Sequence, residues 1–317
     1  MAGEIQIDSV TALTASGSNI VLNNVDTATN RTNLGLGSMA TQNANAVALT
    51  GGSITGTTIV PTTPFSFRNR IINGNLSNPV NQRGAASITA STGYTYDRWY
   101  YDGTSLYQGI EDENVNDGTY VISWEGSGIN AAWKVSTDTT ANNGPDATTG
   151  FTSVSNGGTF TVNEGTEYSK HLWIRFDGTL ANLNKVQVEE GTVVTPFEHR
   201  PISVELSLAQ RYFEKSYDID TAPGTSTQEN SFRTIAPRTL SSATDYMYSI
   251  QYKVIKRSGT DLVIYSTDGT QGSVRDISGG TNTTFRSSLG GASNLMTGFD
   301  IIDTRLYAFQ WTAEAEL

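Results

Sequence analysis

Two histidines and 31 acidic residues are the side chains best suited to acid–base chemistry in this 317-residue chain. Glycoside hydrolysis, for example, needs two carboxylates about 5–9 Å apart across a cleft. Glu189 and Glu190 are neighbours in a predicted strand, so their side chains point to opposite faces and cannot form such a pair. A more distant pair stays open, but there is no G-x-S-x-G motif, and two histidines leave little room for a catalytic triad. We expect no catalytic residues and no enzyme.

Glu198 and His199 lie in the segment PFEHRP, just before a predicted helix. We interpret them as structural residues. Glu198 would pair with Arg200, or either residue would bind backbone donors near the helix start.

No metal or cofactor site is expected. The chain has no cysteine and only two histidines, which excludes thiolate sites and leaves too few imidazoles for a multi-histidine site. The residues 35–40, GLGSMA, match a dinucleotide-binding pattern, but no strand precedes them and no helix follows. Five aspartates could offer oxygen ligands to Ca²⁺, but no D-x-D-x-D-G loop is present and a solvated role is expected. They are Asp218, Asp220, Asp268, Asp300 and Asp303.

Aromatic rings can stack on the apolar face of a sugar, yet most rings in this chain are expected in a core. In DRWYYDG, alternation puts Trp99 and Tyr101 on one face of a strand, and we interpret that pair as mostly buried. Trp124 and Trp133 are also better explained as core residues. Tyr101 and Tyr107 are kept as secondary candidates for ligand binding.

Two polar, glycine-rich segments are the better binding candidates, because loops carry function on rigid scaffolds. In Ser278–Asn294, the residues Asn282, Phe285 and Arg286 offer hydrogen-bond donors, an apolar face and a cation. The second segment runs from 217 to 230 and offers Tyr217 and Asp218. The alternative is that both segments are simple solvated turns.

These residues must be positioned by strands, because alternating apolar runs fill most of the chain after residue 64. In YVISW, Tyr120, Ile122 and Trp124 share one face, and polar turns separate such runs. The pattern over 65–201 predicts an all-β sandwich or jelly roll. From 216 to 317 similar alternation, as in the run from Tyr307 to Ala315, predicts a second β domain.

Between the two predicted β domains, the spacing of apolar residues changes from that of a strand to that of a helix. Ile202, Leu206, Ala209 and Phe213 recur at four, three and four residues, which predicts a helix over 202–215 with that face buried.

The first 64 residues contain no aromatic side chain and four charged ones. Such a segment cannot bury enough apolar surface to offset its own ordering entropy. It is therefore either a flexible linker or a segment that shares a core with other chains. Its many β-branched residues favour the shared core.

The formal net charge of −11 argues against nucleic acid or an anionic membrane as the main partner. No run of about 18 apolar residues is present, and the first ten residues lack the basic start of a secretory signal. We expect a soluble chain that does not insert into a membrane.

Several blocks of sequence resemble tail fibres of tailed bacteriophages. RTNLGLGSMATQNANAVALTGGSITGTT is similar to a segment common in such fibres. RNRIINGNLSNPVNQRG, YTYDRWYYDG and VQVEEGTVVTPFEHRPISVELSLAQRYFEKS resemble the frame of their jelly-roll domain, and FQWTAEAEL resembles their terminal strand. The blocks span nearly the whole chain in order. The jelly-roll part, from about 68 to 201, is shorter than in many relatives, which puts the sugar-binding loops found elsewhere in doubt.

The resemblance implies a mainly β, trimeric fibre of the virion. Its parts would be a thin intertwined segment over 1–64, a jelly roll over 65–201, the connecting helix, and a β domain over 216–317 that faces the receptor. The N-terminal segment would bind the tail, baseplate or an adaptor protein, and the receptor would be a host surface polysaccharide or lipopolysaccharide. Residues on the threefold axis would be Val47, Leu49, Ile54 and Ile59. The rival functions are a glycan-cleaving tailspike and a purely structural decoration or adaptor protein.

Overall fold

The computed structural model describes residues 4–7, 10–16, 19–22, 67–136, 144, 148–163, 171–235, 244–301 and 305–317. The chain divides into two compact units, Met1–Val60 and Pro61–Leu317. In the first unit, β1 (Glu4–Ile7), β2 (Val10–Ser16) and β3 (Asn19–Leu22) form an antiparallel sheet in that order. The residues expected on a threefold axis, Val47, Leu49, Ile54 and Ile59, and the GLGSMA segment lie outside the described residues.

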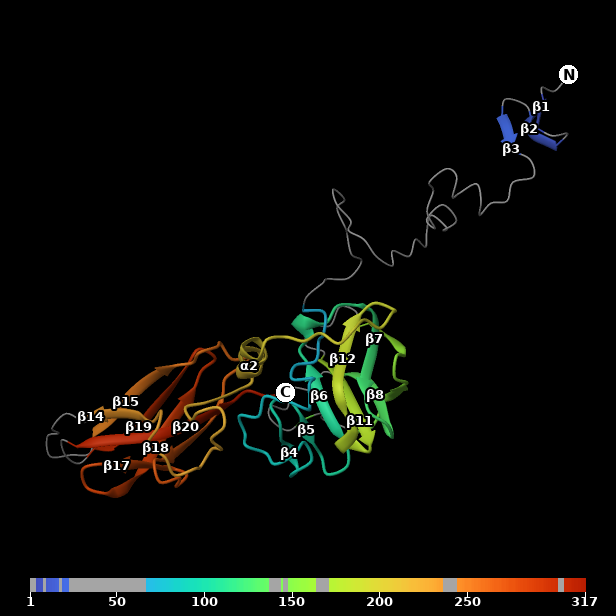
Figure 1. Ribbon diagram of the computed structural model, residues 1–317. Coiled ribbons are helices and arrows are strands. Elements are labelled where there is room, and N and C mark those ends of the chain that lie inside the picture. Colours follow the sequence, from blue (N-terminus) through green and yellow to red (C-terminus); the bar gives the residue numbers. More distant parts are fainter. Residues whose placement is uncertain are drawn as a thin grey trace. The chain divides into compact units, whose positions relative to one another are not determined.

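The second unit is mainly β, as expected, and begins with two antiparallel sheets that we call the sandwich (Figure 1). The six-stranded sheet has the order β4-β5-β6-β11-β8-β9, and the three-stranded sheet has the order β10-β7-β12. In chain order the strands are β4 (Gly93–Tyr94), β5 (Tyr100–Tyr101), β6 (Leu106–Ile110), β7 (Gly118–Glu125), β8 (Ile129–Ser136), β9 (Thr152–Val154), β10 (Thr159–Val162), β11 (His171–Gly178) and β12 (Asn184–Glu190). Short 3₁₀ turns, Asp112–Asn114 and Leu180–Asn182, connect some of them.

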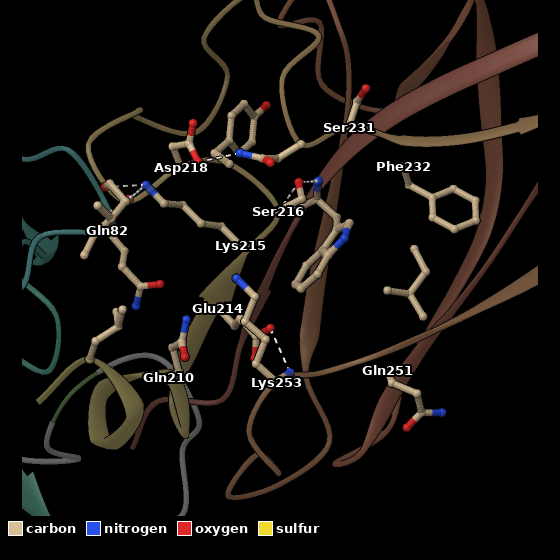
Figure 2. Close-up of a pocket in the computed structure, with 16 residues that line it drawn as sticks. Gln82, Gln210, Glu214, Lys215, Ser216, Asp218, Ser231, Phe232, Gln251 and Lys253 are labelled. Atoms are coloured by element: carbon tan, nitrogen blue, oxygen red, sulfur yellow. Dashed lines mark hydrogen bonds between the residues drawn. The ribbon is translucent and has the colours of Figure 1, made fainter. Parts of the chain in front are cut away.

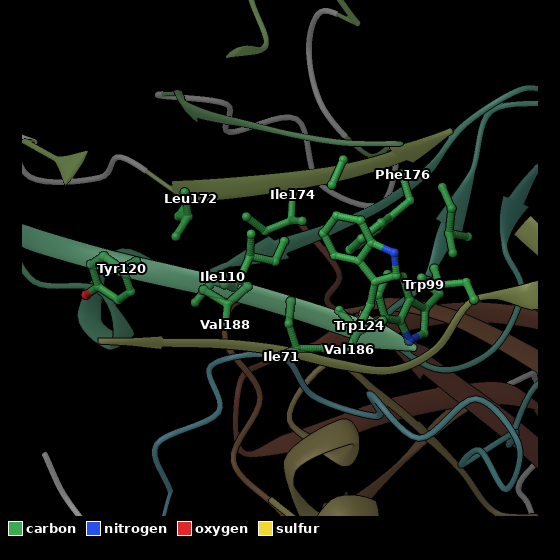
Figure 3. Close-up of a cluster of buried hydrophobic side chains, with 14 of the residues drawn as sticks. Ile71, Trp99, Ile110, Tyr120, Trp124, Leu172, Ile174, Phe176, Val186 and Val188 are labelled. Atoms are coloured by element: carbon green, nitrogen blue, oxygen red, sulfur yellow. The ribbon is translucent and has the colours of Figure 1, made fainter. Parts of the chain in front are cut away.

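One apolar core fills the space between these two sheets (Figure 3). Tyr120, Ile122 and Trp124 of β7 are buried there, which confirms the face predicted from YVISW. Trp99 is fully buried in the same core, and Trp133 packs against it. Because side chains from both sheets meet in a single cluster, the sheets hold each other in place.

The six-stranded sheet is also covered on its other face. Trp173 of β11 and Tyr107 of β6 pack there against Leu317, the last residue of the sequence. Gly109 makes this contact possible, since a Cβ at that position would lie 2.7 Å from Leu317 Cδ1 and 3.0 Å from the Trp173 ring. Residues from the end of the sequence therefore complete the surface of the sandwich.

The connecting helix is shorter than its sequence pattern predicts. The helix α2 spans Ile202–Gln210, and Phe213 lies instead in β13 (Phe213–Lys215). The predicted buried face is correct only in part, because Ala209 is buried while Ile202 is 55% exposed and Leu206 is half-buried. Residues 213–215 pair with β20 instead and are buried there, a tertiary contact that overrides the local helical spacing. Phe213 matched the helical spacing by coincidence.

The rest of the chain forms an eight-stranded sheet ordered β13-β20-β17-β18-β19-β15, with β14 and β16 also paired to β20. Its strands after β13 are β14 (Phe232–Ile235), β15 (Thr244–Gln251), β16 (Asp261–Ser266), β17 (Ser273–Asp276), β18 (Thr281–Gly290), β19 (Asn294–Ile301) and β20 (Leu306–Glu314). Tyr307, Phe309 and Trp311 of β20 are buried in one cluster with Leu295 of β19. Side chains from both β20 and β19 therefore share one core, and β20 pairs with four other strands, β13, β14, β16 and β17.

The interpretation of Ser278–Asn294 as a loop is wrong. Most of that segment forms β18, and only three residues separate β18 from β19. Its threonines explain the difference, because β-branched side chains favour strands even where the composition is polar.

Charged side chains join the eight-stranded sheet to the sandwich. Glu316 forms an ion pair with the buried guanidinium of Arg98 and a second one, at 3.1 Å, with Arg83. Arg83 also forms an ion pair with Glu314 at 3.0 Å, and the Asp97 carboxylate lies 3.9 Å from the Arg83 guanidinium. We call these five residues the junction cluster. The acidic members come from both parts of the unit and the arginines from the sandwich, so the cluster holds the two parts together.

Replacing Glu316 with Ala should destabilise the protein by about 3–5 kcal/mol, because it leaves Arg98 charged and buried without its partner. Urea unfolding followed by tryptophan fluorescence measures this loss. The matched control is Glu125→Ala, which removes the exposed ion pair with Lys185 and should cost at most about 1 kcal/mol. A loss for Glu316→Ala as small as that of the control would contradict the assignment.

Candidate functional site

A cavity of about 500 Å³ opens where α2, β13 and β15 approach the segment 216–232 (Figure 2). We call it the junction cavity. Gln82 contributes to its wall from the sandwich, and the other lining residues belong to α2 and the eight-stranded sheet with its connections. The cavity thus depends on the same contact between the two parts that the junction cluster stabilises.

The floor of the junction cavity is apolar. Trp311 of β20, Phe232 of β14 and Ile250 of β15 line it, and all three also belong to or pack on the core of the eight-stranded sheet. The floor is therefore held rigidly by the packing beneath it.

Lys215 fixes the wall of the junction cavity. Its ammonium donates hydrogen bonds to the backbone carbonyls of Gln82, Ile219 and Thr221 at 2.6–2.8 Å. Burial lowers the pKa of Lys215 to about 8. Gln82 Nε2 donates to the carbonyl of Phe213 at 2.9 Å. Gln82 and β13 are therefore joined by two hydrogen bonds that run in opposite directions.

Glu214 lines the cavity but its carboxylate is fully engaged. One oxygen accepts from the backbone N–H of Lys253 at 3.0 Å, and the other binds the buried ammonium of Lys256. A carboxylate with both oxygens committed is poorly placed to transfer protons. This residue stabilises the site rather than reacting in it.

Two buried glutamines line the cavity with side-chain amide atoms that have no hydrogen-bond partner among the described residues. Gln210 is 7% exposed, and within the described part of the chain its side-chain amide makes no hydrogen bond. Gln82 is 2% exposed and uses its Nε2 on Phe213, which leaves its Oε1 without a donor among the same residues. The cavity therefore offers donors and acceptors above an apolar floor.

The predicted segment 217–230 contributes to this cavity. Tyr217 and Asp218 both line it. The Tyr217 ring is buried, and its hydroxyl accepts a hydrogen bond from the Gly224 N–H at 3.1 Å. Asp218 is exposed and accepts a hydrogen bond from Asn230. Two of the residues predicted from the sequence therefore line this cavity.

The other predicted binding residues lie elsewhere. Asn282 is exposed on β18 and donates to Asp268 at 2.9 Å, while the half-buried Phe285 packs on the core of the eight-stranded sheet. Arg286 belongs to β18, but its side chain lies outside the described residues. The structure does not bring these residues to the junction cavity.

The two candidate tyrosines of the sandwich use their hydroxyls for hydrogen bonds within the sandwich. Tyr107 is 1% exposed and donates to Asp102 at 2.8 Å, and burial raises its pKa to about 12. Tyr101 is half-buried, packs on the sandwich core and donates to the Gly103 carbonyl.

Glu198 has the structural role expected of it. It pairs with Arg200 at 3.3 Å and accepts from the Asn69 N–H at 2.9 Å. Glu189 and Glu190 follow each other in β12, with Glu189 buried and Glu190 half-buried, as adjacent residues on opposite faces should be.

Within the described ranges, no group of three or more histidine or acidic side chains is arranged to hold a metal ion. Asp268, one of the five candidate aspartates, accepts hydrogen bonds from Ser266, Thr270 and Asn282. The same part of the chain holds no helix long and apolar enough to cross a membrane.

No pattern in the sequence points to Gln82 or Gln210. They are 128 positions apart, and glutamine at a single position predicts neither burial nor function. Only the fold brings them to one wall.

Comparison with protein-family models found no family that matches the chain, and comparison with curated protein sequences found no match.

Asp97 links the junction cluster to the cavity wall. Its carboxylate is fully buried and accepts from the Gln82 N–H at 2.8 Å. Burial raises the pKa of Asp97 to about 7, and the nearby Arg83 guanidinium opposes that rise. Near neutral pH the folded protein therefore binds a proton that the unfolded chain does not hold.

Stability should consequently depend on pH through Asp97. Because the folded state binds the proton more tightly than the unfolded state, this group adds stability as the pH falls from about 7 toward 4. Replacing Asp97 with Asn should remove that contribution, so the difference in free energy of unfolding between wild type and variant should change across pH 4.5–7.5. Parallel pH profiles of the two proteins, measured by urea unfolding, would contradict the assignment.

Proposed function

We propose that this protein is a trimeric adhesion fibre of a tailed bacteriophage, which attaches to the virion through its N-terminal segment and binds a glycan on the host surface without cleaving it. The ordered sequence blocks that resemble such fibres support the proposal. The mainly β architecture of the second unit agrees with it, and a jelly-roll topology for the sandwich belongs to the same proposal.

The observation that carries the proposal is the chemistry of the junction cavity. Sugar sites combine an apolar surface for the ring with a few fixed polar groups for the hydroxyls. Trp311 and Phe232 supply the first, and the open amides of Gln82 and Gln210 supply the second. The carboxylate of Glu214 is already bound to the Lys253 backbone N–H and the Lys256 ammonium, so this residue favours binding over catalysis.

In a trimer, a weak affinity of each single site for its sugar would be enough for firm attachment. Three copies on one fibre raise avidity without any new contact, so each cavity can bind its sugar weakly. The N-terminal segment, residues 1–64, would supply the trimer contacts through a shared core. Its small residues would allow close approach of three backbones, and large rings would not fit there.

Adsorption measures the function directly. An excess of purified protein should block adsorption of the phage to its host, because it occupies the receptor. Trp311→Ala removes part of the cavity floor and should weaken the block, and it must be checked for folding by circular dichroism because Trp311 is also a core residue. Phe285→Ala tests the β18 surface in the same way.

Two results would favour the rival functions. Release of reducing ends from host polysaccharide would indicate a glycan-cleaving tailspike. Failure of wild-type protein to block adsorption would favour a structural decoration or adaptor protein.

Assembly can be tested independently. Full-length protein should sediment as a trimer at micromolar concentration, and a chain that starts at Phe65 should not. Ile54→Asp should also weaken assembly, because three carboxylates would meet at one axis and repel one another. A full-length protein that sediments as a monomer would refute the shared core.

A further inference from the structure

We infer that the sugar residue bound in the junction cavity carries an acetamido group, as in an N-acetylated amino sugar. The inference rests on the proposed function, since it specifies the ligand of the same site. It follows from the open amides, from the apolar residues of the cavity lining and from the balance of charge around them.

The open amides are the first observation. Gln210 is 7% exposed and Gln82 is 2% exposed, so bulk water reaches either amide only through the cavity (Figure 2). Neither amide is among the enclosed polar atoms that lack a partner in the described residues, so its free atoms face the space of the cavity. A ligand that hydrogen-bonds to both amides replaces the water there and is oriented by two fixed groups.

The orientation of Gln82 is fixed by the fold. Its Nε2 must be the atom that donates to the Phe213 carbonyl, because a carbonyl accepts and cannot donate. The free end of this amide is therefore the oxygen, an acceptor. Gln210 has both ends free and can supply the complementary donor.

An acetamido group matches this arrangement. Its N–H can donate to Gln82 Oε1, and its carbonyl can accept from Gln210 Nε2. Its methyl group needs an apolar surface, and Leu206, one helical turn before Gln210 in α2, lines the cavity together with Trp311. A hydroxyl in the same place can also donate to one amide and accept from the other, but it has no methyl group to contact the apolar part of the lining.

The charges around the cavity favour a neutral ligand. Glu214 is compensated by Lys256, and the ammonium of Lys215 is enclosed by three backbone carbonyls. Asp218 is exposed and bound to Asn230. Lys253, at the rim, is exposed to solvent, where screening weakens its attraction for an anion. No uncompensated buried cation is therefore available among these residues to hold an acidic sugar.

The test compares matched monosaccharides on the full-length protein by ligand-observed NMR titration. N-acetylglucosamine and N-acetylgalactosamine are measured beside glucose, galactose and glucuronic acid. At least one acetamido sugar should bind about tenfold more tightly than its parent sugar, because the parent lacks the methyl group that contacts the apolar part of the lining. Gln210→Ala should abolish that preference without changing the melting temperature. Gln251→Ala is the control, since this glutamine lines the same cavity but is exposed.

Each other outcome overturns the inference. Equal binding of an acetamido sugar and its parent, or tighter binding of glucuronic acid, would show that the amides do not select the ligand. Loss of the preference in Gln251→Ala but not in Gln210→Ala would place the selecting group at the rim. If no monosaccharide binds while the protein still blocks adsorption, the inference fails and the proposed function stands. If the protein does not block adsorption either, both fail.

Discussion

The buried ion pair between Arg98 and Glu316 is the contact on which the second unit depends. Two charges removed from water are stable only when each has its partner and its remaining hydrogen bonds are satisfied. Arg98 also donates to the Gly109 carbonyl, and its guanidinium lies 3.4 Å from the centre of the Tyr212 ring. The pair therefore links the sandwich and the eight-stranded sheet through a contact that is costly to break, since separating it leaves a buried charge without its partner. The junction cavity lies at the same contact, so its wall depends on this pair.

The sequence predicted features that depend on local pattern. Alternation identified the buried faces of β7 and β20, since side-chain direction in a strand follows directly from residue order. Spacing also predicted a helix from Ile202, but its end was wrong because residues 213–215 pair with β20, about 100 positions later in the chain. The Ser278–Asn294 segment was misread for a similar reason, because polar composition hid a strand whose partners are set by the fold.

The candidate site could be predicted only in part. Tyr217 and Asp218 were found because a long polar segment is itself a local signal. Gln82 and Gln210 were missed, since their importance comes from burial without a partner, which exists only after the sandwich and α2 meet. The junction cluster was missed as well. Arg83, Asp97 and Glu316 look like ordinary surface charges in the sequence, and their pairing is entirely tertiary.

The position of β20 has a consequence for synthesis on the ribosome. It pairs with β13, β14, β16 and β17, all of which precede it in the chain. Those strands emerge with open edges and no central partner, and unpaired edges are where nascent chains associate wrongly. The pairing of β13, β14 and β16 must therefore wait until β20 is released, whereas β15, β17, β18 and β19 can pair with one another before that.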